Sequence, residues 1–265
     1  WVDCGHEINY YNAKAKLTSS RSFNQIQIMQ EKGIIRKYSS DSNGLQAEEQ
    51  FIFMLPDQLK IYFPRIIDRY SNIAGKKSYA MEYYAYPTLA EYFLYWDLNR
   101  NNWQRIFDRL EYILEEFAYY PYSISKKAYM DFYLNKTISR VQLFHKQIKN
   151  LNKNNSWLKS KISINSLMCD PFKDLLPKIK LKINDLYNEK DFCIMHGDFC
   201  FNNILYDHTS GIIRLIDSRG SFGSQCVGIY GDRKYDLAKL AHSAMGFYDY
   251  FVNGLFILKK NKFCF

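Results

Sequence analysis

The stretch that decides the fold of this chain reads His196-Gly197-Asp198-Phe199-Cys200-Phe201-Asn202-Asn203. It directly follows a short apolar segment, FCIM, and a second apolar segment, residues 212–216 (IIRLI), leads to Asp217. Short apolar runs bounded by polar loops are typical of buried strands. We therefore expect the carboxylate of Asp198 and the carboxamide of Asn203 to lie on one loop, facing Asp217 on a neighbouring loop.

These residue types suit a magnesium site next to a catalytic base. Mg²⁺ prefers oxygen ligands in an octahedral array and takes few of them from the protein, because phosphates and water supply the rest. Asn203 and Asp217 meet that demand, while Asp198 can orient an attacking hydroxyl and accept its proton. The structural alternative is that Asp198 caps a turn, Asn203 packs locally and Asp217 ends a strand.

Three segments of the chain resemble the aminoglycoside phosphotransferase and choline kinase family, whose members are small-molecule relatives of the protein kinases. They read HGDFCFNNILYD (196–207), LIDSRG (215–220) and GDRKYDLAKL (231–240). The wording of further segments is similar to phosphotransferases encoded with surface-polysaccharide (capsule) genes, namely SRSFN (20–24), EYYAYPTL (82–89) and IDSRGSFG (216–223). The resemblance covers most of the chain.

The resemblance implies an α+β, two-lobed protein-kinase-like fold with a small β-rich N-lobe and a larger, mainly helical C-lobe. It implies that Asp198 is the catalytic base and that Asn203 and Asp217 are the metal ligands. His196 matches the motif histidine, which we expect to hold the loop by hydrogen bonds rather than to transfer a proton. Asp236 matches a residue that braces the catalytic loop, the alternative being an exposed acid at a helix N-terminus.

The small lobe is expected to bind ATP. Kinases place a strand lysine on the α- and β-phosphates and pair it with a glutamate on the following helix. Lys37 is preferred to Arg36 for this role, because Lys37 shares the strand parity of an inward-facing Ile35. Glu48 lies on the apolar face of its predicted helix, where an unpaired carboxylate would be unfavourable, so it is the expected partner, with Glu49 as the fallback. The alternative is an exposed Lys37 and a partly solvated Glu48.

The connection between the lobes is expected to contact adenine. Backbone groups from Glu82 to Tyr84 would bond the base, with Met81 behind it. Two features depart from the family pattern. The segment 18–24, which would cover the phosphates, contains no glycine. Arg219 follows the metal-ligand aspartate and could bind an anionic group on the acceptor, or instead form a salt bridge inside the loop.

The composition is that of a globular protein. Of 265 residues, 47% are hydrophobic and 24% are charged, which argues against a disordered, collagen-like or coiled-coil chain. The net charge is +9, but no arginine-rich block or zinc-binding spacing accompanies it, so we expect no nucleic-acid partner. The longest apolar runs fall well short of the ~20 residues that cross a bilayer, so we expect no membrane span. The six cysteines form no C-x-x-C pair, so we expect reduced thiols in a cytoplasmic protein.

We divide the chain into three parts. Residues 1–20 form a leader that resembles the end of a sugar-nucleotidyltransferase domain, which would be fused to or associated with this chain. Residues 21–86 form the nucleotide-binding N-lobe, and residues 87–265 form the helical C-lobe with the catalytic and metal loops. The chain opens with Trp1 rather than Met, so we expect a fragment of a longer protein. Periodicity predicts strands over 22–30, 34–38, 62–70 and 78–84, and helices over 45–55, 103–117, 126–150 and 171–188.

These features predict a Mg²⁺- and ATP-dependent phosphotransferase that acts on a hydroxyl group of a small molecule. A sugar, sugar derivative or amino alcohol of surface-polysaccharide biosynthesis is the expected acceptor. One alternative is an aminoglycoside-type antibiotic kinase, although polycationic substrates favour an acidic cleft and this chain is basic overall. Another alternative is a nucleotide-binding pseudokinase with a scaffolding role, against which the intact Asp198, Asn203 and Asp217 argue.

Overall fold

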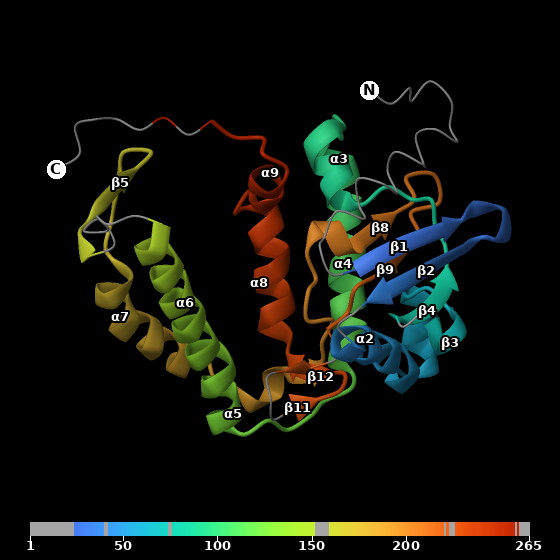
Figure 1. Ribbon diagram of the computed structural model, residues 1–265, viewed down its shortest axis with the longest axis horizontal. Coiled ribbons are helices and arrows are strands. Elements are labelled where there is room, and N and C mark those ends of the chain that lie inside the picture. Colours follow the sequence, from blue (N-terminus) through green and yellow to red (C-terminus); the bar gives the residue numbers. More distant parts are fainter. Residues whose placement is uncertain are drawn as a thin grey trace.

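The structure is a computed structural model (Figure 1), and it describes residues 24–39, 42–73, 76–151, 159–219, 221–222, 226–257 and 259. The expected leader, 1–20, lies outside these residues, as does the expected phosphate-covering segment up to Phe23. In Figure 1 the N-terminal strands lie at the right of the view, and long helices of the second half of the chain lie at the centre and left.

The N-terminal region is a four-stranded antiparallel sheet with the strand order β1-β2-β4-β3. Strands β1 and β2 form an antiparallel hairpin, in which Ile26 of β1 pairs with Lys37 of β2. Its turn is a short 3₁₀ segment that ends at Gly33, where φ is 62°, a left-handed conformation that glycine adopts without strain. The strands are β1 (Asn24–Met29), β2 (Ile34–Ser39), β3 (Ile66–Ile73) and β4 (Lys76–Glu82).

Helix α2 (Ser42–Met54) packs on this sheet through its apolar face. Leu45 is buried against Tyr79 and Met81 of the sheet, whereas Phe51 and Ile52 are buried in the main apolar core. Glu48 lies on the same face and is also buried, as the spacing predicted. The helix starts at Ser42, three residues before the start predicted for the helix over 45–55.

The third strand begins later than predicted. Residues 62–65 are not part of a strand, because a 3₁₀ helix covers Asp57–Tyr62 and β3 starts only at Ile66. Leu59 and Tyr62 lie three residues apart and are both buried. Side chains three residues apart align on one side of a 3₁₀ helix, so this segment buries both without forming a strand.

The remainder of the chain is mainly helical. Thr88 caps the first of these helices, since its hydroxyl accepts from the Glu91 N–H while the Glu91 carboxylate accepts from the Thr88 N–H. The apolar stripe predicted over 103–117 is buried on α4, and the predicted helix over 126–150 is interrupted by a π-helical turn, Asp131–Asn135. The helices are α3 (Leu89–Tyr95), α4 (Arg100–Ala118), α5 (Lys126–Met130), α6 (Lys136–Leu151), α7 (Phe172–Asp185), α8 (Arg233–Ala244) and α9 (Tyr248–Val252).

Short strand pairs fix the loops of this second region. The predicted strands at 192–195 and 212–216 are present and belong to two different pairs, each of which delivers one motif loop. The hairpin of β5 and β6 was not predicted. The pairs are β5 (Ile162–Ile164) with β6 (Leu167–Cys169), β7 (Phe192–Ile194) with β12 (Tyr230–Asp232), β8 (Ile204–Tyr206) with β9 (Ile213–Leu215), and β10 (Ser221–Phe222) with β11 (Cys226–Val227).

The main apolar core joins the N-terminal region to α4. The ring centroids of Phe51 and Phe63 are 5.5 Å apart, and Phe63 stacks on Phe117 of α4 at 6.4 Å. The imidazole of His196 also stacks on Phe63, with ring centroids 6.1 Å apart. Burying an aromatic ring of this size stabilises the fold by about 2–3 kcal/mol. The motif loop is therefore anchored directly on the core that joins the two regions.

A second aromatic cluster fixes the end of α5 and the start of α6 against α8. Phe132 stacks on Phe222 with ring centroids 3.9 Å apart, and Tyr235 of α8 meets Phe132 edge-on at 5.0 Å. This packing brings the first turn of α6 next to the first turn of α8. Lys136, the first residue of α6, therefore lies beside Tyr235 of α8.

The sequence predicts reduced thiols and no membrane-spanning segment. Cys193 and Cys200 are buried, Cys169 is half-buried, and all three carry free thiols. Among the residues described, no helix combines the length and the apolar character needed to cross a membrane.

Candidate active site

Three residues that are far apart in the sequence meet in a charged cluster beneath the N-terminal sheet. The ammonium of Lys37, on β2, lies 2.5 Å from Oε1 of Glu48, on α2, and also contacts Oδ1 of Asp217, which follows β9. The backbone N–H of Asp217 donates to the same Glu48 oxygen at 3.2 Å. The structure thus contains the predicted ion pair of Lys37 with Glu48 and adds Asp217 to it.

The strand parity used to choose Lys37 agrees with the structure. Lys37 is 5% exposed and faces inward, where its ammonium lies 5.8 Å from the ring centroid of Tyr79 on β4. The preceding residue, Arg36, points to the other face of the sheet, where it forms an ion pair with Asp68 of β3 at 2.6 Å. Adjacent strand residues face opposite sides of a sheet, so only Lys37 can reach the motif loops.

The ammonium group of Lys37 in this cluster stays protonated at neutral pH. Burial alone would lower the pKa of Lys37, but attraction by Asp217 and Glu48 outweighs it and holds that pKa well above its usual value. Burial raises the pKa of Glu48, and Lys37 partly offsets that increase. Burial also raises the pKa of Tyr79 well above its usual value. The neighbours of Lys37 therefore keep a full positive charge inside the protein.

Asp236 of α8 braces the motif loop. Its two carboxylate oxygens accept hydrogen bonds from the backbone N–H groups of His196 and Gly197, at 2.7 and 2.8 Å. Asp236 is 1% exposed, so the alternative of an exposed helix-terminal acid is wrong. Burial raises its pKa to about 7, although the two N–H groups favour the ionised form.

Gly197 permits the sharp turn of this loop. Its φ is +82°, and a Cβ at this position would lie 3.0 Å from the Cβ of Arg219. The backbone N–H of Arg219 donates to the carbonyl of His196 at 3.0 Å, so the two motif loops run side by side. A larger residue than glycine would be strained in φ and would push these loops apart.

His196 serves the loop structurally. It is fully buried among aromatic rings, and its Nδ1 accepts the backbone N–H of Asp198 at 3.2 Å. Burial lowers the pKa of His196 to about 4, so the ring is neutral at physiological pH. A neutral ring that accepts a loop hydrogen bond agrees with the expectation that His196 holds the loop.

Asp198 faces two cations that the motif alone does not identify as its partners. Its Oδ1 lies 2.7 Å from the ammonium of Lys239, on α8, and its Oδ2 lies 3.4 Å from the guanidinium of Arg219. Burial would raise the pKa of Asp198, but Lys239 and Arg219 outweigh it and lower that pKa. The carboxylate is therefore ionised, as an acceptor of a hydroxyl proton must be.

Arg219 was expected either to bind an acceptor anion or to form a salt bridge inside its own loop. Its ion pair reaches instead to Asp198 on the neighbouring loop. Its side chain is 37% exposed, so solvent weakens this pair. The guanidinium therefore lies beside the carboxylate of Asp198.

The chemistry of Asn203 and Asp217 fits a magnesium ion that is held mainly by phosphates and water. The Nδ2 of Asn203 donates to the backbone carbonyl of Asp198 at 2.9 Å, which fixes the carboxamide on the loop and leaves Oδ1 as its donor oxygen. The carboxylate of Asp217 is 40% exposed. In the part of the chain that the structure describes, no group of three or more His, Cys, Asp or Glu side chains could hold a metal. Two oxygen donors without a full cage are what Mg²⁺ uses with nucleotide phosphates.

The expected adenine contacts lie at the end of β4. Met81 is buried and packs in a cluster with Leu45 and Tyr79. The N–H of Glu82 donates to the carbonyl of Arg65, and the N–H of Tyr83 donates to the carbonyl of Gly33. These two N–H groups are therefore already used in hydrogen bonds within the N-terminal region.

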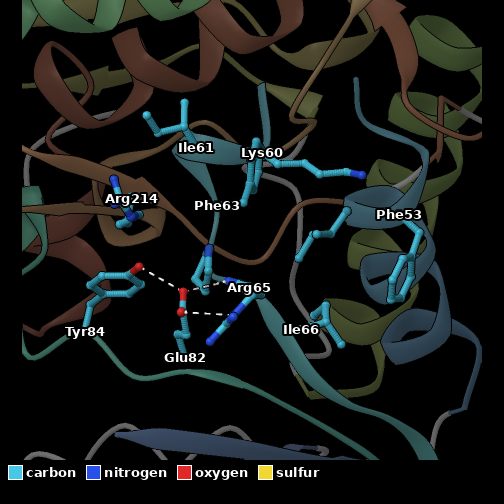
Figure 2. Close-up of a pocket in the computed structure, with 11 residues that line it drawn as sticks. Phe53, Lys60, Ile61, Phe63, Arg65, Ile66, Glu82, Tyr84 and Arg214 are labelled. Atoms are coloured by element: carbon cyan, nitrogen blue, oxygen red, sulfur yellow. Dashed lines mark hydrogen bonds and ion pairs between the residues drawn. The ribbon is translucent and has the colours of Figure 1, made fainter. Parts of the chain in front are cut away.

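The side chains of Glu82 and Tyr84 line a cavity of about 580 Å³ (Figure 2). The carboxylate of Glu82 accepts from the Tyr84 hydroxyl at 3.0 Å and from the Arg65 backbone N–H at 3.1 Å. The guanidinium of Arg214 lies 4.9 Å from the Tyr84 ring centroid. None of the predicted catalytic or metal residues lines this cavity, which is formed by Ile52, Phe53, Lys60, Ile61, Phe63, Pro64, Arg65, Ile66, Glu82, Tyr84 and Arg214.

Three residues near this site were not predicted from the sequence. Lys239 lies three residues after Asp236, so helical spacing could have placed it on the same face of α8. Tyr79 lies opposite Lys37 in the strand register, which only the pairing of β2 and β4 reveals. Lys136 gave no signal, because its approach to Asp198 depends on the packing of the second aromatic cluster.

Comparisons with known proteins identify the fold. No protein family model matches the chain, and no curated protein does. A solved structure of a thermostable mutant of aminoglycoside phosphotransferase APH(4)-Ia has a TM-score of 0.51 over 77% of this chain, at 15% identity, and the chain spans 63% of that protein. Aminoglycoside phosphotransferase APH(3'')-Id from Streptomyces rimosus has a TM-score of 0.51 at 11% identity, covering 98% of this chain and 94% of its own. A ternary complex of a further APH(4)-Ia mutant with ADP and hygromycin B has a TM-score of 0.51 at 14% identity, covering 85% and 75%.

These likenesses extend over both the antiparallel sheet and the helical remainder of the chain. At such low sequence identity these likenesses show the fold alone. The catalytic interpretation depends on the geometry of the charged cluster and the motif loops. The protein is an α+β chain with the two-lobed, protein-kinase-like fold of the aminoglycoside phosphotransferases.

Proposed function

We propose that this protein transfers the γ-phosphoryl group of Mg²⁺-bound ATP to a hydroxyl group of a small molecule. One observation carries the proposal: Lys37 meets Glu48 and Asp217, while the loop of Asp217 is bonded to the loop that carries Asp198. A cation for the donor phosphates, a metal ligand and an ionised base thus lie together. The protein-kinase-like fold supports this interpretation.

The residues of the N-lobe, 21–86, bind the donor nucleotide in this proposal. Lys37 binds the α- and β-phosphates and Glu48 orients its ammonium. Met81 packs behind adenine at the end of β4. Asn203 and Asp217 hold Mg²⁺, which when bound neutralises phosphate charge. Lys37 contacts Asp217 in this structure. The nucleotide phosphates would bind Lys37 and the metal would bind Asp217, so the two side chains would separate.

Asp198 acts on the acceptor, which binds next to the C-lobe, 87–265. The acceptor oxygen forms a bond to the γ-phosphorus while the bond from that phosphorus to the bridging oxygen of ADP breaks, and the hydroxyl proton passes to the Asp198 carboxylate. Phosphoryl transfer has a loose transition state, so positioning and charge neutralisation provide most of the rate enhancement. A carboxylate whose pKa is lowered by Lys239 and Arg219 suits this role, because it stays ionised and orients the hydroxyl.

A finer proposal concerns the acceptor and its setting. The segments that resemble capsule-associated phosphotransferases favour a sugar, a sugar derivative or an amino alcohol of surface-polysaccharide biosynthesis as the acceptor. The protein would act on it in the cytoplasm. Residues 1–20, which resemble the end of a sugar-nucleotidyltransferase domain, favour a nucleotidyltransferase domain that is fused to or associated with this chain. An aminoglycoside antibiotic as acceptor and a pseudokinase scaffold without turnover are the competing interpretations.

The experiment that tests the proposal measures ADP formation from Mg²⁺ and ATP with a panel of sugars, amino sugars and choline-like alcohols. With an active acceptor, Asp198→Asn lowers turnover by at least ~10²-fold, because general-base groups contribute about that much. The melting temperature of Asp198→Asn stays within about 4 °C of the parent, which corresponds to about 1 kcal/mol. Asp185→Asn, at an exposed site in the last turn of α7, is the control and keeps normal turnover.

Two results would contradict the proposal. Near-normal turnover in Asp198→Asn would show that the carboxylate is structural. Folded protein whose melting temperature does not respond to millimolar ATP with Mg²⁺ would remove the nucleotide site altogether, because a ligand that binds only the folded state must stabilise it.

A further inference from the structure

Four cationic side chains from three parts of the chain form a cluster that includes both ion-pair partners of Asp198. Lys136 and Arg140 belong to the first turns of α6, Arg219 follows β9, and Lys239 belongs to α8. Arg219 and Lys239 contact the Asp198 carboxylate directly. Lys136 lies near the other three cations, since Arg219, Arg140 and Lys239 each lower the pKa of Lys136.

Lys136 is held in this cluster by aromatic contacts. Its ammonium lies 4.3 Å from the ring centroid of Phe132 and 5.4 Å from that of Tyr235. It donates a hydrogen bond of 3.5 Å to the Tyr235 hydroxyl. Within the part of the chain that the structure describes, no carboxylate lies within ion-pair distance of Lys136. Burial, together with the three neighbouring cations, lowers the pKa of Lys136 to about 8.

The nearby carboxylates have other partners. Asp232 accepts from the Tyr133 hydroxyl at 3.0 Å and is paired with Lys234 at 3.3 Å. Asp236 accepts two backbone N–H groups of the motif loop, and Asp249 accepts from Asn202 at 2.7 Å. Asp198 is therefore the only described carboxylate with an ion pair to this cluster, and the positive charges exceed it in number.

An excess of half-buried positive charge beside a reaction centre is unfavourable without a counter-ion, and such arrangements are typical of binding sites for anions. We propose that the hydroxyl acceptor carries a phosphate or carboxylate group, which binds Lys136 and Arg219 while the reacting hydroxyl lies at Asp198. This inference rests on the proposed phosphotransferase function and narrows its acceptor class. A polycationic acceptor would instead meet like charges on three sides.

The acceptor geometry follows from the placement of the cluster. Arg219 contacts Asp198, whereas the ammonium of Lys136 lies against the Phe132 and Tyr235 rings. In this proposal an acceptor reaches from Lys136 to Asp198. Its anionic group then lies against α6, and its hydroxyl lies against the motif loop. Arg140, one turn further along α6, extends the positive surface outward and attracts the anion before it binds.

The test uses three probes with one carbon skeleton and different charge: glycerol 3-phosphate, glycerate and glycerol. Each is titrated calorimetrically into the full chain loaded with Mg²⁺ and ADP. At least one anionic probe is expected to bind about tenfold more tightly than glycerol, and the stronger of the two shows whether the site prefers phosphate or carboxylate. Kanamycin, a polycation, is expected to bind more weakly than the anionic probes.

Two variants locate the site. Lys136→Met is expected to weaken the anionic probe about tenfold and to leave glycerol and Mg²⁺-ADP affinity unchanged. Lys146→Met removes an exposed lysine from the same helix and is expected to change nothing, so it controls for net charge. Screening by salt weakens the anionic probes but not glycerol.

The outcomes separate this proposal from the one on which it rests. Mg²⁺-ADP binding with no preference for the anionic probes, or with tighter kanamycin binding, overturns the anion site and leaves the kinase intact. Weaker Mg²⁺-ADP binding in Lys136→Met with an unchanged probe affinity would assign the cluster to the nucleotide phosphates, and also overturns it. Absence of all nucleotide binding in the folded parent overturns the kinase itself.

Discussion

The ammonium of Lys37 lies 2.5 Å from the carboxylate of Glu48, and both side chains are almost fully buried. This ion pair joins the second strand to the helix that packs on the sheet. Charges at this depth are tolerated only when they are paired, because each loses its hydration. The contact of the same ammonium with Asp217 extends the pair to the motif loops, so Lys37 links the second strand, the helix and the loop that follows β9 in one charged cluster.

We predict that Lys37→Met abolishes the rise in melting temperature that Mg²⁺ and ATP produce in the parent. The variant removes the only described cation that contacts both Glu48 and Asp217. It also leaves Glu48 without its counter-charge, so the free protein is expected to be less stable by about 3 kcal/mol or more. Differential scanning fluorimetry with and without nucleotide measures both effects. Lys32→Met, at an exposed turn position, is the matched control, and an ATP response that survives equally in both variants would refute the assignment.

We predict that Asp217→Asn makes nucleotide binding insensitive to Mg²⁺. The substitution keeps the size of the side chain but removes the anionic oxygen that a divalent ion needs beside phosphate groups. Asn203→Ala is expected to act in the same direction with a smaller effect, because it removes a neutral ligand. Calorimetric titration of ATP with and without Mg²⁺ provides the measurement. Equal Mg²⁺-ATP affinity in the parent and in Asp217→Asn would place the metal elsewhere.

We predict that His196 makes the protein less stable as the pH falls from 7 to 4. The pKa of the folded imidazole is lowered to about 4, whereas the unfolded chain titrates near 6.5. Below pH 6.5 the unfolded state takes up a proton that the folded state does not, so the free energy of unfolding falls with pH, by about 3 kcal/mol for this group. Above pH 6.5 the group contributes no pH dependence.

The measurement for His196 compares urea unfolding of the parent and His196→Asn at pH 7 and pH 4. Asparagine can accept the Asp198 N–H in place of Nδ1 but does not titrate. Asp236 acts in the opposite direction, because its raised pKa of about 7 stabilises the fold as the pH falls, and its presence in both proteins cancels its effect. An identical pH dependence of the two proteins would contradict the buried, neutral state of His196.

We predict that Asp236→Ala lowers both stability and turnover. The variant leaves the buried N–H groups of His196 and Gly197 without acceptors, and each such group costs about 1–3 kcal/mol. A fall in melting temperature of at least ~4 °C follows from the smaller of these values. Turnover falls in parallel because the loop that carries Asp198 loses its brace. Asp185→Ala serves as the exposed control, and a stable, fully active Asp236→Ala protein would show that the brace is dispensable.

Local sequence determined much of this protein. The 3.6-residue stripe in α4, the capping box at Thr88 and the hairpin at Gly33 depend on residues a few positions apart, and such contacts form the same way in any fold. The carboxylate and carboxamide of the motif loop were likewise predictable, because Asp198 and Asn203 are separated by only five residues. Glu48 could be paired with Lys37 in advance, since a carboxylate on an apolar helix face requires a partner.

Tertiary packing decided the rest. The environment of Asp198 depends on Lys239 and on Arg219, which reach it from different elements. Lys136 joins them because Phe132 stacks on Phe222, a contact between residues that no local pattern connects. The start of β3 was also misjudged, because burial of Leu59 and Tyr62 favours a 3₁₀ helix over a strand. Local periodicity records which side chains share a face, but the charge around a reacting group is the sum over every element packed against it, and only the folded chain fixes that sum.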